Sequence, residues 1–71
     1  MEFSIGDKVA LIHSMSYLKT AENMPMLRPP DLVSLGEVGQ VIGIRSNDMY
    51  EVRFRRGSFL IPFEKLEKEA T

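Results

Sequence analysis

The sequence predicts a small all-β domain, and three observations support this fold class. Apolar residues recur at every second position in short runs, which is typical of strands with one buried face. Gly, Pro, Asn and Asp separate these runs, as expected where the chain turns. The 71 residues contain 44% hydrophobic and 27% charged residues, the composition of a folded globular chain. We therefore expect one domain over residues 1–71.

The first strand is expected over residues 7–12, where Val9 and Leu11 fall on the same face. A long loop over residues 13–35 follows. Pro25, Pro29 and Pro30 lack a backbone N–H and have a fixed φ, so neither a helix nor a central strand can run through them. The sequence therefore predicts an irregular, proline-containing loop after the first strand.

The second half of the chain predicts two hairpins. A strand over residues 39–45 contains Gly39 and Gly43, which permit a bend or a bulge. Asn47-Asp48 forms a turn, since both residues tolerate positive φ, and residues 50–55 then show the cleanest alternation in the chain. Arg56-Gly57 makes the next turn before a strand over residues 58–62. This part of the chain is therefore expected to form an antiparallel meander.

At the C-terminal end, a single 3₁₀ or helical turn is expected to seat Phe63 and Leu66 against the core, before a charged tail at residues 67–71. One strand, a long loop, two hairpins and a closing turn describe an SH3-like barrel of about five short strands. A domain of this size has a net stability of roughly 3–5 kcal/mol, so few apolar side chains can be left outside its core.

Several classes of site are excluded or disfavoured by composition. The chain has no cysteine, which removes disulfides and thiolate metal sites. Its nine basic and ten acidic residues give a net charge of −1, and no apolar run is long enough to cross a bilayer. The one histidine, His13, lacks a second histidine or a spaced carboxylate for catalysis or metal binding. We expect a non-enzymatic monomer without a metal, a cofactor or membrane insertion.

The proline-containing loop is the first candidate binding surface, because Met24, Met26 and Leu27 stand where a connecting loop would carry polar residues. The alternative is that these side chains cap the open end of the barrel, and we expect at least one of them to do so. Arg53 and Arg55 are expected on the outer face of their strand. The predicted partner-binding residues are Tyr17, Lys19, Met24, Met26, Leu27, Arg28, Arg53, Arg55 and Arg56.

A more specific resemblance rests on motifs spread from Phe3 to Glu67. They are Phe3-x-Ile5-Gly6-x-Lys8-Val9, Tyr17-x-Lys19-Thr20-Ala21-Glu22-x-Met24-Pro-Met-Leu-Arg-Pro-Pro30-Asp31, Gly36-Glu37-x-Gly39, Val52-Arg53-Phe54-x-Arg56-Gly57-x-Phe59-Leu60 and Leu66-Glu67. With these motifs the sequence resembles the SipA family, small cyanobacterial proteins that interact with the sensor histidine kinase NblS and have plastid relatives.

The resemblance implies a regulator that binds the ATP-binding catalytic domain of the kinase and stimulates its autophosphorylation in light and nutrient stress signalling. It also implies a location in the cyanobacterial cytoplasm, or in the plastid stroma for a plastid relative. Two alternatives stay open, a small barrel that binds nucleic acid and a docking subunit of a photosynthetic complex. Nucleic acid is disfavoured because such binders combine a strongly positive domain with exposed aromatic residues.

Overall fold

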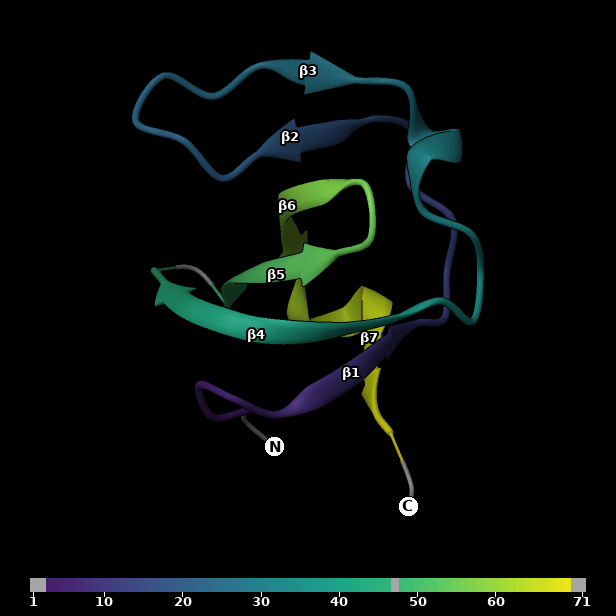
Figure 1. Cartoon of the computed structure of the whole chain (residues 1–71), viewed down its shortest axis with the longest axis vertical. Helices are drawn as coiled ribbons and strands as arrows, with labels where there is room; N and C mark the ends of the chain where they lie inside the picture. Colours follow the sequence, from purple (N-terminus) through teal and green to yellow (C-terminus); the bar gives the residue numbers. More distant parts are fainter. Residues whose placement is uncertain (1–2, 47, 70–71) are drawn as a thin grey trace.

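The computed structural model describes residues 3–46 and 48–69. In these residues the chain forms one antiparallel sheet of seven strands in the order β3-β2-β6-β5-β4-β1-β7 (Figure 1). The prediction of a small all-β domain is therefore confirmed. The elements are β1 (Lys8–Leu11), β2 (Leu18–Thr20), β3 (Leu27–Arg28), η1 (Pro30–Leu32), β4 (Val38–Arg45), β5 (Met49–Phe54), β6 (Gly57–Pro62), η2 (Phe63–Lys65) and β7 (Leu66–Lys68), where η denotes a 3₁₀ turn.

The sheet curls around a single core, and its strands supply alternate side chains to that core. In β5, Tyr50, Val52 and Phe54 are buried, whereas Arg53 is exposed, as the alternation predicts. The sheet is not closed, because β3 and β7 stand at its two ends and are not paired with each other. Seven strands form instead of about five, because two strands arise within the predicted loop and one at the start of the predicted tail, in addition to the four strands that were placed by residue range.

The prediction of an irregular loop over residues 13–35 is wrong in one respect, since β2 and β3 form a hairpin within it. The prolines flank β3 and do not lie inside it. The N–H of Thr20 donates to the carbonyl of Met26 at 2.9 Å, so by the antiparallel alternation the backbone groups of Leu27 face away from β2. Pro25 and Pro29 lie two positions before and after Leu27, on that same outer edge. Among the described residues, no strand pairs with the backbone N–H groups on that edge, so proline, which lacks a backbone N–H, is compatible with these positions.

The C-terminal segment was only partly predicted. The 3₁₀ turn η2 forms, Phe63 packs against the core, and Leu66 is buried, as expected. The charged residues that follow are not simply a tail, because β7 pairs with β1 through Val9↔Lys68, Ala10↔Glu67 and Leu11↔Leu66. A three-residue strand with one apolar side chain has too little alternation to be recognised in the sequence.

The turns follow the predicted chemistry where the structure describes them. The register of β4 against β5 shifts between Val41 and Gly43, which confirms the expected bulge. Asp48 has a φ of 58°, the positive value predicted for that turn. The other residue assigned to the turn, Asn47, lies outside the described residues. Phe54 pairs with Gly57, so the second hairpin turns at residues 55–56, one position earlier than predicted.

Candidate binding surface

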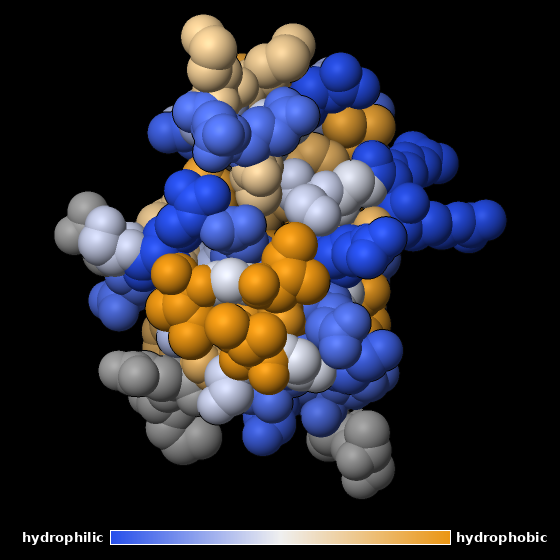
Figure 2. Space-filling model, turned by 60° about the vertical axis from the view of Figure 1, so that its left-hand side comes forward, coloured by the Kyte–Doolittle hydropathy of each residue, from blue (hydrophilic) through white to orange (hydrophobic). Residues whose placement is uncertain are grey.

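The β2–β3 hairpin lies at one end of the sheet (Figure 1). It carries three large apolar side chains that are exposed. Met24, Met26 and Leu27 are 84%, 57% and 65% exposed. Apolar side chains project at this end of the molecule in the space-filling view (Figure 2, top). The expectation that at least one of the three would cap the core is therefore wrong. Leu18 of β2, which is fully buried, is the residue that anchors the hairpin.

Polar contacts hold the hairpin closed. The hydroxyl of Thr20 accepts a hydrogen bond from the N–H of Met26 at 2.8 Å and donates to Glu22 Oε1 at 3.2 Å. The N–H of Ala21 donates to the carbonyl of Ser58 in β6 at 3.0 Å, which ties the hairpin to the rest of the sheet. The exposed methionine and leucine side chains therefore stand on a hydrogen-bonded element and not on a free loop.

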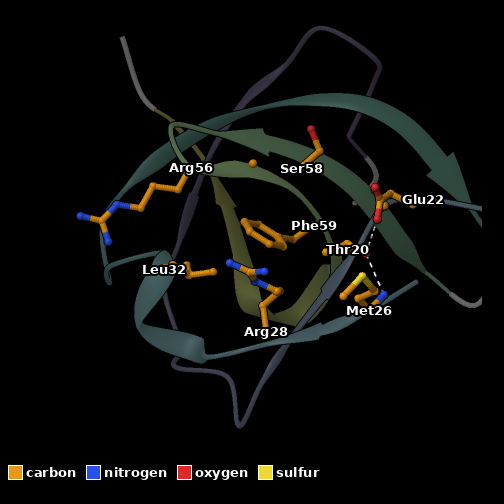
Figure 3. Close-up of a pocket in the computed structure, with 10 residues that line it drawn as sticks. Thr20, Glu22, Met26, Arg28, Leu32, Arg56, Ser58 and Phe59 are labelled. Carbon is orange, nitrogen blue, oxygen red and sulfur yellow. Dashed lines mark hydrogen bonds between the residues drawn. The ribbon is translucent and has the colours of Figure 1, made fainter. Parts of the chain in front are cut away.

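Beside the hairpin lies a pocket of about 580 Å³ between β2, β3, η1 and the β5–β6 turn (Figure 3). Arg28 of β3 extends into it, toward Leu32 and Phe59 (Figure 3). Arg56 comes from the β5–β6 turn on the other side and extends outward (Figure 3). Two arginines that are 28 positions apart in the chain thus line one hollow together with apolar side chains, and of the two it is Arg28 whose guanidinium group points inward.

The structure does not bring all the predicted binding residues together. Tyr17 and Lys19 line a separate hollow of about 320 Å³ on the other side of β2 from the arginine pocket. Arg55 shares a third hollow with Arg56, beside Glu37. Arg53 lies on the exposed face of β5 and lines none of these hollows. The predicted cationic surface is therefore divided over more than one face.

The arginines of the chain also differ in whether a carboxylate pairs with them. Arg45 forms an ion pair with Glu51 on the neighbouring strand. Within residues 3–46 and 48–69, Arg28 and Arg56 have no carboxylate within 4.0 Å. These two guanidinium groups are therefore open to an external anion as far as the described residues show.

A second apolar surface was not predicted. In Figure 2 an orange patch covers the lower part of the face, in the region of β4 and the turn before β1, where Ile5, Ile42 and Ile44 are exposed. We call these three residues the isoleucine patch. The signal was present in the sequence, because Val41 and Ile42 are consecutive in a strand and only one of them can face the core.

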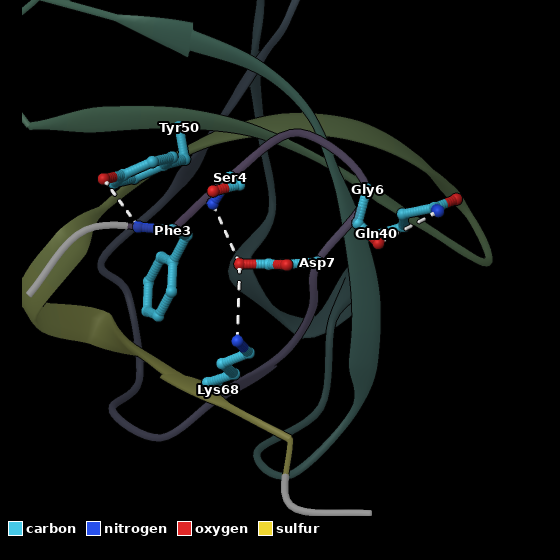
Figure 4. A network of polar contacts seen from close by, with 7 residues as sticks. All are labelled: Phe3, Ser4, Gly6, Asp7, Gln40, Tyr50 and Lys68. Carbon is cyan, nitrogen blue, oxygen red and sulfur yellow. Dashed lines mark hydrogen bonds and ion pairs between the residues drawn. The ribbon is translucent and has the colours of Figure 1, made fainter.

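The segment that carries Ile5 is fastened by polar contacts (Figure 4). The N–H of Phe3 donates to the Tyr50 hydroxyl at 3.2 Å. Asp7 Oδ2 accepts from the N–H of Ser4 at 2.9 Å and lies 3.9 Å from the Lys68 ammonium of β7. The N-terminal segment is thus connected to β5 and β7, and the isoleucine patch has a defined shape.

The described residues contain no group of three or more His, Cys, Asp or Glu side chains placed to hold a metal ion. His13 is exposed. Nor does any helix in the described part of the chain have the length and apolar character needed to cross a membrane.

Comparison with known proteins corrects the resemblance drawn from the sequence. The model of the family "Protein CHLORORESPIRATORY REDUCTION 42-like" (CRR42-like) matches residues 5–66. The chain is 30% identical over 61 residues to Protein CHLORORESPIRATORY REDUCTION 42, chloroplastic, from Arabidopsis thaliana. The match covers 84% of this chain and 50% of the relative, so the chain spans about half the length of that protein. No solved structure matches.

The assignment to the SipA family is therefore wrong, and with it the classification as a histidine kinase regulator of cyanobacterial stress signalling. The relative found is named as a chloroplastic protein, which is consistent with the plastid location and does not confirm the cyanobacterial one. Both comparisons lead to the same assignment. The chain belongs to the CRR42-like family.

Proposed function

We propose that this chain is a non-enzymatic docking module that binds another protein through its β2–β3 hairpin. One observation carries the proposal: Met24, Met26 and Leu27 are exposed on a hydrogen-bonded hairpin, in a domain of only 71 residues. A domain this small gains stability from every apolar side chain that it buries. Adjacent exposed apolar residues are typical of interaction sites, and Met adapts its shape to a partner surface.

The family suggests the setting. The name of the Arabidopsis relative links that protein to chlororespiratory reduction in the chloroplast. We propose that the partner of this chain is a protein component of the same process, which is closest to the docking-subunit alternative drawn from the sequence. The histidine kinase depended on the resemblance that the comparisons overturn, and it is not part of the proposal.

Nucleic acid is a weaker candidate ligand. The two Tyr and four Phe residues all lie in the described part of the chain. Tyr17 is exposed, whereas the other five are buried or partly buried. Proteins that bind single strands without sequence preference stack successive bases on exposed aromatic rings in a positively charged groove. One exposed ring in a chain of net charge −1 does not form such a platform.

The test is an affinity experiment with matched variants. Wild-type protein, a hairpin variant with Met24→Gln, Met26→Gln and Leu27→Gln, and a control with Ile5→Gln and Ile44→Gln are immobilised and exposed to chloroplast extract. Retained proteins are quantified by mass spectrometry, and the main retained component is purified and titrated against each variant. All replaced residues are exposed, so each variant is expected to fold, which circular dichroism confirms.

We expect the wild type and the control to retain the same components of the chlororespiratory system. The hairpin variant should bind the purified component at least about tenfold more weakly, because burying even one such side chain contributes about 1.5–3 kcal/mol. Equal binding by the hairpin variant would refute the proposed surface. Retention of ribosomal or other nucleic-acid complexes that nuclease treatment removes would favour the alternative function.

A further inference from the structure

The pocket beside the hairpin has the composition of an anion site with an apolar floor. Arg28 approaches from β3 and Arg56 from the β5–β6 turn, and both line the same hollow of about 580 Å³ (Figure 3). Met26, Leu32 and Phe59 supply the apolar part of the lining. A ligand that satisfies this pocket must carry a negative group beside an apolar group.

The charges of the pocket are not satisfied from within the described residues. Glu22 is the acidic residue that lines the hollow, and its Oε1 accepts a hydrogen bond from the hydroxyl of Thr20. No carboxylate of residues 3–46 or 48–69 lies within 4.0 Å of the Arg28 or Arg56 guanidinium groups. Guanidinium groups bind carboxylates with paired, charge-assisted hydrogen bonds, which makes arginine the preferred residue for this contact.

The lining also distinguishes an acidic peptide from a nucleic acid. Phe59 is 2% exposed and offers no ring face for stacking a base. Two arginines match one or two carboxylates, whereas a phosphate backbone requires a continuous basic track. The pocket adjoins the exposed side chains of the hairpin, so a partner segment seated there would contact both surfaces. Leucine or phenylalanine next to the acid would fill the space over Leu32.

We propose that this pocket binds a short acidic segment of the partner protein, in which one Asp or Glu carboxylate pairs with Arg28 inside the hollow, a second pairs with Arg56 at its edge, and a neighbouring large apolar side chain contacts Met26 and Leu32. The inference rests on the proposed docking function and adds the chemistry of the partner to it. It concerns the pocket beside the hairpin, which shares Met26 with the proposed docking surface.

The probe is an acetylated, amidated hexapeptide of alternating Glu and Leu, and the matched control peptide has Gln in place of Glu. The peptides are titrated into the full-length, isotope-labelled chain, and amide shifts are followed at low and physiological salt. The variants are Arg28→Gln and Arg56→Gln. Arg53→Gln is the matched control, because it makes the same charge change at an exposed arginine that does not line the pocket.

We expect saturable shifts at the amides of residues 28, 32 and 56–59 with the Glu peptide. Arg28→Gln and Arg56→Gln should each weaken binding about three- to tenfold, and Arg53→Gln by less than about twofold, because Arg53 does not line the pocket and would make no direct hydrogen bond to the bound carboxylates. The affinity should fall as salt is raised. Well-dispersed spectra of the variants show that they are folded.

Three results would overturn the inference. These are equal binding of the Gln peptide, equal weakening by all three arginine substitutions, and no saturable shift at millimolar peptide. Tighter binding of a single-stranded oligonucleotide with the same shifts would assign the pocket to nucleic acid instead. If the peptide fails but the hairpin variant still loses its chloroplast partner, the pocket assignment alone is wrong and the docking function stands.

Discussion

Gly39→Ala tests how closely the strands of this domain pack. Gly39 lies in β4, is buried, and pairs with Val9 of β1. A Cβ added there would lie 2.7 Å from Cγ1 of Val52, 2.8 Å from the carbonyl oxygen of Arg53 and 2.8 Å from Cδ1 of Phe54. Distances below 3.0 Å require atoms to move, and a backbone oxygen in a hydrogen-bonded strand cannot rotate away.

Overpacking a well-filled core typically costs about 1–3 kcal/mol. We expect Gly39→Ala to lower the free energy of unfolding by about 3 kcal/mol, the upper end of this range, because three atoms are too close to the added Cβ and one of them belongs to the backbone. A domain of this size has roughly 3–5 kcal/mol in total. The substitution should therefore remove most of the free energy of unfolding and leave a measurable fraction of the protein unfolded in buffer.

Urea unfolding followed by circular dichroism at 25 °C measures the effect. Gly36→Ala is the matched control, because no atom lies within 4 Å of the added Cβ and only the positive φ of 85° opposes it. The free energy of unfolding of that control should fall by about 1–2 kcal/mol. Adding Val52→Ala to Gly39→Ala should not restore stability, because the carbonyl of Arg53 stays in place. A loss below about 0.5 kcal/mol, or full rescue by Val52→Ala, would refute the packing argument.

Two further predictions concern hydrogen bonds and the sheet edge. Tyr50→Phe removes the hydroxyl that accepts a hydrogen bond from the buried N–H of Phe3. The free energy of unfolding, measured in urea, should fall by about 1 kcal/mol. An unchanged value would show that this contact contributes nothing to stability. Replacing Pro25 and Pro29 by Ala restores two donors on the outer edge of β3 and should increase concentration-dependent self-association in sedimentation experiments. Pro30→Ala is the control for that change, and equal association of all variants would contradict the edge argument.

The sequence predicted the elements whose signal is local. The alternation around Val52 identified the core face of β5, and Gly43 marked the bulge in β4. The β2–β3 hairpin was missed because its strands have three and two residues, too few for a period to show. Their pairing depends on the contact of β2 with β6, which is distant in the chain.

The candidate site likewise has features that the sequence predicted and features that it did not. The exposed apolar residues of the hairpin and the exposure of Arg53 were predicted from residue type and alternation. The pocket was not, because Arg28 and Arg56 meet only through folding. The expectation that Met24, Met26 or Leu27 would cap the core was wrong, since Leu18 already anchors the hairpin.

By itself the sequence determined the all-β class and the alternation of buried and exposed residue types in β5, because these follow from composition and from a period of two along the strand. The resemblance that it suggested had to be corrected to the CRR42-like family. Only the tertiary structure decided which strands stand at the edges of the sheet and which arginines share a pocket. Those features depend on contacts between residues far apart in the chain, and the pattern of neighbouring residues carries no information about such distances.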